Sequence, residues 1–414
     1  MKQEPSFIES DESLDRISSL PDPITGHILG MMPLKDAVRT SILSRNWRFN
    51  WSKSSTLEFD SNLLTLSGKP DTERKVVRII NQVLIIHNSP ITKFKLSHKD
   101  LTAVCDIDAW IVYLSRRSVW EFVLKIWKGQ KYLLPSSLFL FPSLGYLKLR
   151  NCVLRPPPYF RGFPLLKNLV LCSVTIAQDA LAHLISSCHI LERLTLSNVD
   201  WNFDLNVCAP QLQFFEASGN LNKIRFQNAS KLSVVSISST VKARARSLAL
   251  RRPSRLIWSV DDLPNIRRLE LKNCSSMFLG TVPLMPFVHL VHISLSINFG
   301  NHEEKTDALQ LLRCAPNLQE LEIESVTGKG RGGKPRDIWW AKYLKYSQLR
   351  TVEIDDIRGV TSELNFIESI LSNSPVLETV TMTPAAGEWT SDLTTELIRF
   401  RRASPKAEII LVES

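Results

Sequence analysis

A nine-residue phrase, L-x-x-L-x-L-x-x-C/N, recurs along this chain and constrains its fold more than any other feature. The clearest copies are LGYLKLRNC (144–152), LERLTLSNV (191–199) and IRRLELKNC (266–274). Twelve copies in the same phase follow one another between residues 91 and 385, at steps of 20 to 34 residues. One turn of a leucine-rich repeat takes about 20–29 residues, so most steps fit that architecture and the longest steps imply insertions.

Alternation within each copy places its leucines on one face of a strand and the intervening residues on the other face. A single repeat cannot bury its leucines alone, but stacked parallel strands share one continuous core. Helical spacing of apolar residues marks the connections at 71–87, 106–117, 177–187 and 361–372. The sequence therefore predicts an α/β leucine-rich-repeat solenoid, a curved parallel sheet with helices outside. The rival is an ordinary α/β sheet, whose strands would not keep this fixed phrase.

A different pattern precedes the repeats, at residues 15–51. It predicts three short helices: one capped by Asp22 with Pro23 at its first position, one over 35–42, and one capped by Ser44. So short a segment cannot close a core around the many apolar side chains that it carries. These side chains must pack either on the rest of this chain, as an N-terminal cap, or on a second polypeptide.

The motifs of this segment are I-S-x-L-P from Ile17, P-L-K-D-A-V-R-T-S-I-L-S from Pro33, and W-R-x-x-W ending at Trp51. The segment resembles an F-box of the plant type, which implies docking on the Skp-type adaptor of a cullin–RING ubiquitin ligase. The adaptor-facing residues that the resemblance implies are Leu20, Pro21, Ile24, Ile28, Leu29, Pro33, Leu34, Val38, Leu43, Trp47 and Trp51. Gly26 and Gly30 depart from the family pattern, and each should cost the first helix about 1 kcal/mol relative to Ala.

The end of the chain, within 343–411, reads LRTVEIDDIRGVTSELNFIESILSNSPVLETVTM and then FRRASPKAEIIL. It resembles the FBD module found at the end of plant F-box leucine-rich-repeat proteins. The expected organisation is a polar, disordered segment at 1–14, an F-box at 15–53, leucine-rich repeats at 54–342, and an FBD-like module at 343–414 that continues the solenoid.

The outward strand positions of the repeats change charge along the chain. In the early repeats they are Lys93, Lys95, Lys125, Lys148 and Arg150. In the late repeats they are Glu320, Glu322, Glu324, Glu353 and Asp355. The strand face is therefore expected to be basic at its N-terminal end and acidic at its C-terminal end, and this polarity would orient a protein target with complementary charges. The alternative is an ordinary solvated strand face.

Nothing in the sequence argues for an enzyme, a cofactor or a metal. The segment 328–335 nearly spells a phosphate-binding loop, but Pro335 replaces the hydroxyl that would hold Mg²⁺. His289 and His292 give H-x-x-H on a strand pattern without a nearby carboxylate, which argues against a metal site. The seven cysteines are scattered without a C-x-x-C pair, which fits a reducing intracellular compartment, the cytoplasm or the nucleus.

The remaining features are compatible with a water-soluble protein. The net charge of +10 favours acidic partners, nucleic acid included, and a basic run at 242–255 is either a solvated surface or an acidic-partner site. The N-terminus is polar and acidic, and the longest uncharged run contains Gly and Pro, so we expect neither a secretory signal nor a membrane segment. Cys152 and Cys274 follow strands and are expected to be buried small apolar groups.

The function that these features favour is a non-catalytic substrate-recognition subunit of a Skp–cullin–F-box ubiquitin ligase. The F-box would dock on the Skp-type adaptor, and through it on a cullin and a RING protein, while the repeats capture an unknown protein target for ubiquitination. One alternative is a leucine-rich-repeat scaffold in which the F-box-like segment is only an N-terminal cap. Another is a basic nucleic-acid binder, which the scarcity of aromatic residues in the basic run disfavours.

Overall fold

The computed structural model describes residues 20–43, 47–62, 72–102, 105–200, 203–220, 224–239, 263, 265–273, 286–326, 345–385, 395 and 397–412. The chain divides into two compact units, Met1–Gln130 and Lys131–Ser414. The first unit thus joins the N-terminal helices to the first repeats, whereas the sequence suggested a boundary near residue 53. The polar segment 1–14, the basic run 242–255 and the loop 328–335 lie outside the described residues.

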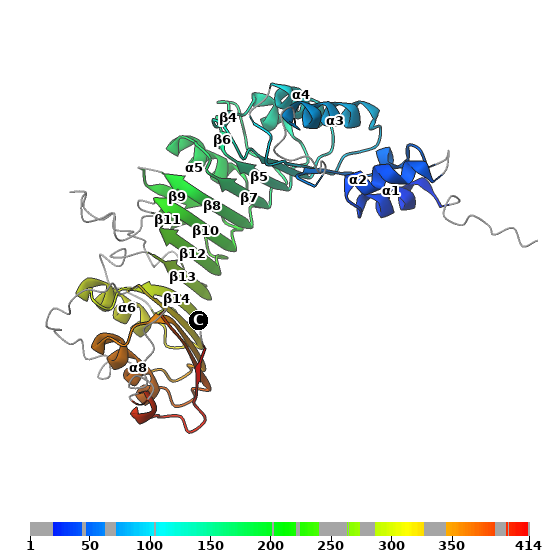
Figure 1. Ribbon diagram of the computed structural model, residues 1–414. Coiled ribbons are helices and arrows are strands. Elements are labelled where there is room, and N and C mark those ends of the chain that lie inside the picture. The colour runs from blue at the N-terminus through cyan, green and yellow to red at the C-terminus, as the bar shows by residue number, and fades with distance from the viewer. Residues whose placement is uncertain are drawn as a thin grey trace, which may run out of the picture. The chain divides into compact units, whose positions relative to one another are not determined.

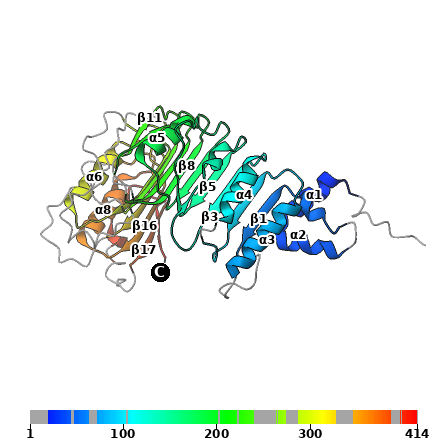
Figure 2. The same ribbon diagram turned by 90° about the horizontal axis from the view of Figure 1, so that it is seen from above.

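The first unit combines short helices with parallel strands (Figures 1 and 2). Its elements are α1 (Asp22–Gly30), α2 (Leu34–Arg39), η1 (Thr40–Ile42), η2 (Asn50–Lys53), β1 (Thr56–Asp60), α3 (Thr72–Ile86), β2 (Lys93–Ser97), α4 (Asp106–Ser115) and β3 (Glu121–Lys125). β1 pairs with β2 and β2 with β3, and the register aligns Leu57 with Phe94 and Phe94 with Phe122. The ring centroids of Phe94 and Phe122 are 5.8 Å apart, so aromatic stacking fills this part of the core, where most later repeats have aliphatic side chains.

The N-terminal helices begin slightly earlier than the sequence suggested. Pro21, in an extended conformation, takes the cap position of α1, and Asp22 is the first helical residue. Pro33 does the same for α2. Proline is tolerated there because the first N–H groups of a helix have no intrahelical partner. Of the third expected helix the described residues contain the 3₁₀ turn η2, and its expected cap, Ser44, lies outside them.

The packing around Gly26 explains why this helix-weakening residue lies in the middle of α1. A Cβ atom at this position would lie 2.8 Å from the carbonyl oxygen of Lys53 on η2. The two elements can therefore approach this closely only where α1 has no side chain. A residue without a side chain at this position is therefore the condition for packing α1 on η2.

The second unit contains a parallel sheet that continues to the end of the chain (Figure 2). Its helical elements are η3 (Ser136–Leu140), α5 (Gln178–Ser187), α6 (His302–Arg313) and α8 (Thr361–Asn373). In sheet order its main strands are β5 (Tyr146–Arg150), β7 (Asn168–Cys172), β8 (Arg193–Asp200), β10 (Phe214–Asn220), β12 (Val234–Ser239), β13 (Arg268–Lys272), β14 (His292–Ile297), β15 (Glu320–Ser325), β16 (Thr351–Ile357), β17 (Thr379–Pro384) and β18 (Glu408–Leu411). Two small parallel pairs, β4 (Tyr132–Leu133) with β6 (Cys152–Val153) and β9 (Leu205–Cys208) with β11 (Ile224–Gln227), lie beside it.

The register of this sheet confirms the repeat phase read from the sequence. The fourth residue of successive copies forms one line across the strands: Leu147, Leu169, Leu194, Phe215, Val235, Leu269, Ile293, Leu321, Val352 and Val380. All of these side chains are buried. The parallel strands and their outer helices confirm the leucine-rich-repeat solenoid, and β16 pairs with β15 so that the C-terminal module continues the same sheet.

Two buried glutamates hold the turns that follow strands in the last repeats. Glu363 on α8 accepts hydrogen bonds from the backbone N–H groups of Arg358 (3.0 Å) and Val360 (3.2 Å), and Ser325 Oγ donates to its other oxygen (2.5 Å). Glu304 on α6 likewise accepts from the N–H of Asn298 (3.0 Å). A carboxylate that accepts backbone N–H groups in this way replaces the water that a turn would otherwise need.

The other expectations about the interior concern cysteines, membranes and metals. Cys152 is buried, as expected, and burial raises the pKa of its thiol to about 12; Cys274 lies outside the described residues. Among the residues that the structure describes, no helix is long and apolar enough to cross a membrane. Nor does this part of the chain bring three or more His, Cys, Asp or Glu side chains together as metal ligands.

Candidate interaction surfaces

The N-terminal helices and the turns beside them expose several large apolar side chains. α1 turns Thr25 and Leu29 inward and leaves Ile24 (48% exposed) and Ile28 (41%) on its outer side. The neighbouring exposed residues on α2, η1 and the adjoining turns are Met31, Val38, Ile42, Leu43 and Phe49. We call these seven residues the apolar helical surface. Large exposed apolar side chains concentrated in one short segment of a folded protein are candidates for an interaction site.

Four of the eleven expected adaptor-facing residues are buried within this chain. Leu29 (1% exposed), Leu34 (6%), Trp47 (6%) and Trp51 (6%) lie in the interior of this chain. η2, which carries Trp51, packs closely on α1, and the missing side chain of Gly26 permits this approach. The two tryptophans therefore complete a core within the first unit, as the N-terminal-cap alternative required.

The other seven expected residues remain accessible. Ile24, Ile28, Val38 and Leu43 belong to the apolar helical surface, Pro21 and Pro33 are exposed at the helix starts, and Leu20 is half-buried. Sequence reasoning did not include Met31, Ile42 and Phe49, which the structure adds to this surface. Ile42 is 87% exposed. Its position four residues after Val38 could have placed it on the same side of the helix as Val38.

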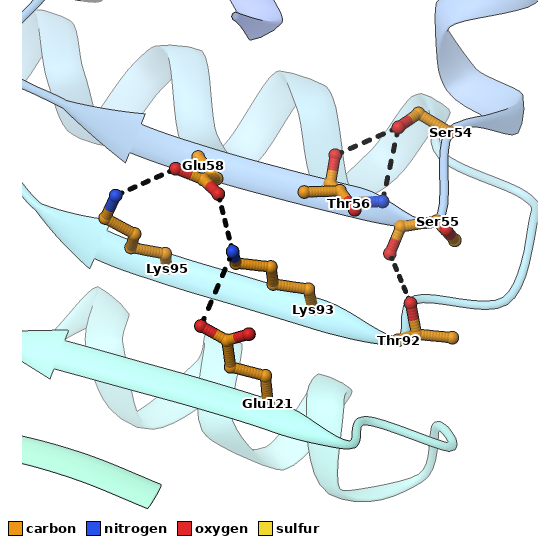
Figure 3. A network of polar contacts seen from close by, with 8 residues as sticks. All are labelled: Ser54, Ser55, Thr56, Glu58, Thr92, Lys93, Lys95 and Glu121. Atoms are coloured by element: carbon orange, nitrogen blue, oxygen red, sulfur yellow. Dashed lines mark hydrogen bonds and ion pairs between the residues drawn. The ribbon is translucent and has the colours of Figure 1, made fainter. Parts of the chain in front are cut away.

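The outer face of the first strands is a network of compensated charges rather than a basic patch (Figure 3). Lys93 Nζ lies 3.0 Å from Glu58 Oε1 and 3.5 Å from Glu121 Oε1, and Lys95 Nζ lies 2.8 Å from Glu58 Oε2. Partial burial alone would raise the pKa of Glu58, but the hydrogen bonds and charges of Lys95 and Lys93 outweigh it and lower the pKa.

This network corrects the expected basic end of the strand face. Lys93 and Lys95 do point outward, since β2 alternates half-exposed and buried residues, but Glu58 on β1 and Glu121 on β3 neutralise them. The sequence reasoning overlooked Glu58 because the repeat copy around it is only partial. Lys125, at the end of β3, lies with its ammonium 6.0 Å from the ring centroid of Trp127.

Within the second unit the charges of the strand face do differ between the first and last strands. Lys148 and Arg150 lie at half-exposed positions of β5. The guanidinium of Arg193 on β8 stacks over the ring of Phe214 on β10, 4.0 Å from its centroid. No acidic side chain occupies the outward positions of β5, β7 or β8 between Tyr146 and Ser197, so this end of the unit is basic.

Five carboxylates gather on the strand face at the other end of the unit. Glu320, Glu322 and Glu324 alternate along β15, and Glu353 and Asp355 alternate along β16. The parallel register places Glu322 beside Glu353 and Glu324 beside Asp355. We call these five residues the acidic strand face. Like charges directly opposite each other on neighbouring strands are destabilising, so this arrangement does not serve the stability of the sheet.

Two nitrogen-bearing side chains, His292 and Arg268, contact the acidic strand face from the strands that precede it in the sheet. His292 Nδ1 on β14 is 2.9 Å from Glu320 Oε2, and Arg268 Nη2 on β13 is 4.0 Å from Glu322 Oε1 while its Nε is 2.5 Å from Glu270. His289, which precedes β14, is exposed in the connecting turn. The two histidines of the H-x-x-H pair thus lie in different settings, one in the turn and one buried on the strand.

Family models match three parts of the chain. The F-box domain matches residues 17–58, and the model of the leucine-rich repeats of FBD-associated F-box protein At5g56370 matches residues 107–323. The FBD model matches residues 346–382. The matched regions coincide with the N-terminal helices, the repeat strands and the strand–helix–strand unit of β16, α8 and β17.

Curated relatives from Arabidopsis thaliana resemble the chain over most of its length. F-box/FBD/LRR-repeat protein At1g13570 is 33% identical, over 97% of this chain and 99% of the relative. FBD-associated F-box protein At5g56370 is 27% identical, over 90% of this chain and 91% of the relative. F-box/LRR-repeat protein At3g59200 is 33% identical, over 77% of this chain and 70% of the relative.

Proposed function

We propose, from the premise that this chain belongs to the plant F-box/FBD/LRR-repeat protein family, that it is a substrate-recognition subunit of a Skp–cullin–F-box ubiquitin ligase. The F-box and the leucine-rich repeats together support a role as a non-catalytic substrate adaptor. The finer proposal is that the F-box binds a Skp-type adaptor, and through it a cullin and a RING protein, and that the repeats hold a protein target. Such a role would place the protein in the cytoplasm or the nucleus.

The observation that carries the proposal is the apolar helical surface. Its members are exposed although the same segment buries Leu29, Leu34, Trp47 and Trp51. The segment already buries two tryptophans in its own core, so its folding does not require Ile28, Ile42 and Leu43 to be exposed to solvent together. A hydrophobic partner surface would cover them, and the centre of such an interface carries most of the binding free energy.

In this proposal the protein positions the target and takes no part in the chemical step of ubiquitin transfer. Holding a target beside a charged ubiquitin-carrying enzyme raises the effective concentration of the target lysines. The strand face of the repeats is the surface for that task, because the outward residues of β5, β15 and β16 are exposed or half-exposed while the alternate residues form the core.

The test is co-expression of the full chain with a Skp-type adaptor, followed by purification through a tag on the adaptor. The wild-type chain should co-purify, and Ile28→Asp combined with Val38→Asp should abolish co-purification, because each change puts a charge into an apolar interface. The matched control is Ile85→Asp with Ile86→Asp, which alters exposed isoleucines on α3 of the same unit and should leave the complex intact.

A second candidate function is a repeat scaffold whose N-terminal helices only cap the first unit. The burial of Trp47 and Trp51 within the chain favours this candidate. It predicts that the adaptor does not co-purify, or that both aspartate pairs leave co-purification unchanged. Either result would overturn the ligase proposal and leave the scaffold.

A further inference from the structure

We infer that the acidic strand face binds an extended, lysine- or arginine-rich segment of a protein target, with basic side chains at alternate positions of that segment. This inference rests on the proposed target-capturing role of the repeats. It goes further by naming the chemistry of the target and the strands, β15 and β16, that receive it.

The first observation is the register of the carboxylates. Glu322 and Glu353 are cross-strand neighbours, and so are Glu324 and Asp355. Among the residues that the structure describes, Glu353 and Asp355 form no ion pair, and Glu324 receives a hydrogen bond only from the Ser296 hydroxyl (2.6 Å). Neighbouring strands that repel each other in this way are stabilised when a cationic ligand lies across them.

The second observation is a buried histidine at the edge of this face. His292 is 3% exposed, although it occupies an outward position of β14 next to Glu320 and Glu322. Its Nδ1 contacts Glu320, but its Nε2 has no hydrogen-bond partner and lies 3.6 Å from Glu322 Oε1. Ser294, the next outward residue, is also 3% exposed. The imidazole of His292 therefore lies between Glu320 and Glu322 at the edge of the acidic strand face. Among the described residues no cation lies within ion-pair distance of Glu324, Glu353 or Asp355, so these three carboxylates remain for a ligand.

The spacing of the carboxylates distinguishes a peptide from a single metal ion. Alternate residues of a strand repeat about every 6.6 Å, and neighbouring strands lie about 4.8 Å apart, so the five carboxylates cover a lattice rather than converge on one point. The described residues contain no group of three or more ligands that could hold a metal ion. An extended peptide along β15 presents its alternate side chains at the same repeat, so each Lys or Arg can reach a carboxylate.

The experiment measures binding of a fluorescent peptide of ten residues, alternating Lys and Thr, to the full chain co-expressed with a Skp-type adaptor. A peptide with five Lys followed by five Thr tests the spacing of the basic residues. A peptide with Glu in place of Lys tests the sign of their charge. The test variant is Glu322→Gln with Glu353→Gln. Its control is Glu303→Gln with Glu368→Gln, which removes the same charge from exposed positions on α6 and α8 of the same repeats.

We expect the test variant to weaken binding of the alternating peptide by about tenfold at low salt and the control variant by less than about twofold, since general charge attraction is weak. The test variant should also unfold at a higher temperature than wild type, because the repulsion between β15 and β16 is relieved. Equal weakening by both variants, equal binding of the alternating and block peptides, or no binding of the alternating peptide would each overturn the inference.

Adaptor co-purification is scored in the same preparations. Loss of the adaptor with intact peptide binding would overturn the ligase proposal and leave the basic-segment site. Intact adaptor binding without peptide binding would overturn the basic-segment site and leave the ligase proposal. The ligase proposal and the basic-segment site can therefore be overturned independently of each other.

Discussion

Gly26 on α1 lies so close to Lys53 on η2 that a Cβ atom at Gly26 would stand 2.8 Å from the Lys53 carbonyl oxygen. Helix propensity alone predicts that Gly26→Ala stabilises the protein by about 1 kcal/mol. Because a backbone carbonyl cannot move aside as a flexible side chain can, we expect the opposite result, a loss of about 1–3 kcal/mol from overpacking. Urea denaturation of wild type and Gly26→Ala would measure the difference.

Gly30→Ala provides the comparison for this prediction. A Cβ at Gly30 would lie 3.2 Å from Ser54 Oγ, which accepts a hydrogen bond from the backbone N–H of Thr56 (3.2 Å). We therefore expect Gly30→Ala to cost less than Gly26→Ala, because a side chain and its hydrogen bond, rather than a backbone carbonyl, must adjust. If Gly26→Ala were as stable as wild type or more stable, the close approach of η2 to α1 would not be a constraint.

Trp51 and Ile42 separate stability from partner binding in the N-terminal segment. Trp51 is 6% exposed and Ile42 is 87% exposed. Trp51→Ala should lower the free energy of unfolding by about 3–5 kcal/mol in the chain without an adaptor, since a large buried side chain is lost. Ile42→Ala should stay within about 0.5 kcal/mol of wild type, as surface changes usually do. The measurement is chemical denaturation of each variant alone.

The opposite pattern is expected for the complex. Ile42→Asp should weaken adaptor binding while the isolated chain keeps its stability. A Trp51→Ala variant as stable as wild type would mean that the indole does not belong to the chain's own core, and the adaptor-facing role first expected for it would then stand.

The fold was predictable because one phrase repeats in a fixed phase. Each copy carries its own alternation, and an error in one copy is corrected by its neighbours, so the anchor residues from Leu147 to Val380 fall on one line across the sheet. The turns between strands have no such repetition. The buried Glu304 and Glu363 therefore escaped notice, because a glutamate in a helical pattern reads as a solvated residue.

The sites were only partly predictable, for a related reason. The alternation correctly placed Lys93 and Glu322 on the outward face, but it could not show which outward residues meet across strands. Glu58 lies 37 residues before Lys95 in sequence, and only the register shows that they form an ion pair. Trp51 lies on η2, and its burial depends on how η2 packs on α1, which no pattern within a short segment reveals.

Glu363 should matter far more for stability than its neighbours on α8. It accepts two backbone N–H groups and a serine hydroxyl while being 2% exposed. Glu363→Ala leaves these donors without partners, and we expect a loss of about 2–4 kcal/mol, given about 1–3 kcal/mol for each buried unsatisfied group. Amide hydrogen exchange of Arg358 and Val360 should accelerate in the same variant, whereas Glu368→Ala on the exposed side should change neither quantity.

His87 should make the stability of the first unit depend on pH. Its ring is 2% exposed, and its Nε2–H donates to the Ser54 carbonyl oxygen (2.7 Å), which ties the end of α3 to the start of β1. Burial lowers the pKa of His87 below its usual 6.5. Below pH 6.5 the unfolded chain therefore binds a proton that the folded chain does not, so stability is full above that pH and falls as the pH decreases.

The variant His87→Gln removes this titration, because a glutamine amide can still donate to Ser54 but does not ionise at these pH values. Urea unfolding at pH 7.5, 6.5 and 5.5 should show a shallower loss for His87→Gln than for wild type, by up to about 1.4 kcal/mol per pH unit. Some slope will remain, because burial also lowers the pKa of His98. His27→Gln, at an exposed position of α1, should retain the wild-type slope. Parallel curves for wild type and His87→Gln would show that the buried ring does not govern the acid sensitivity of this unit.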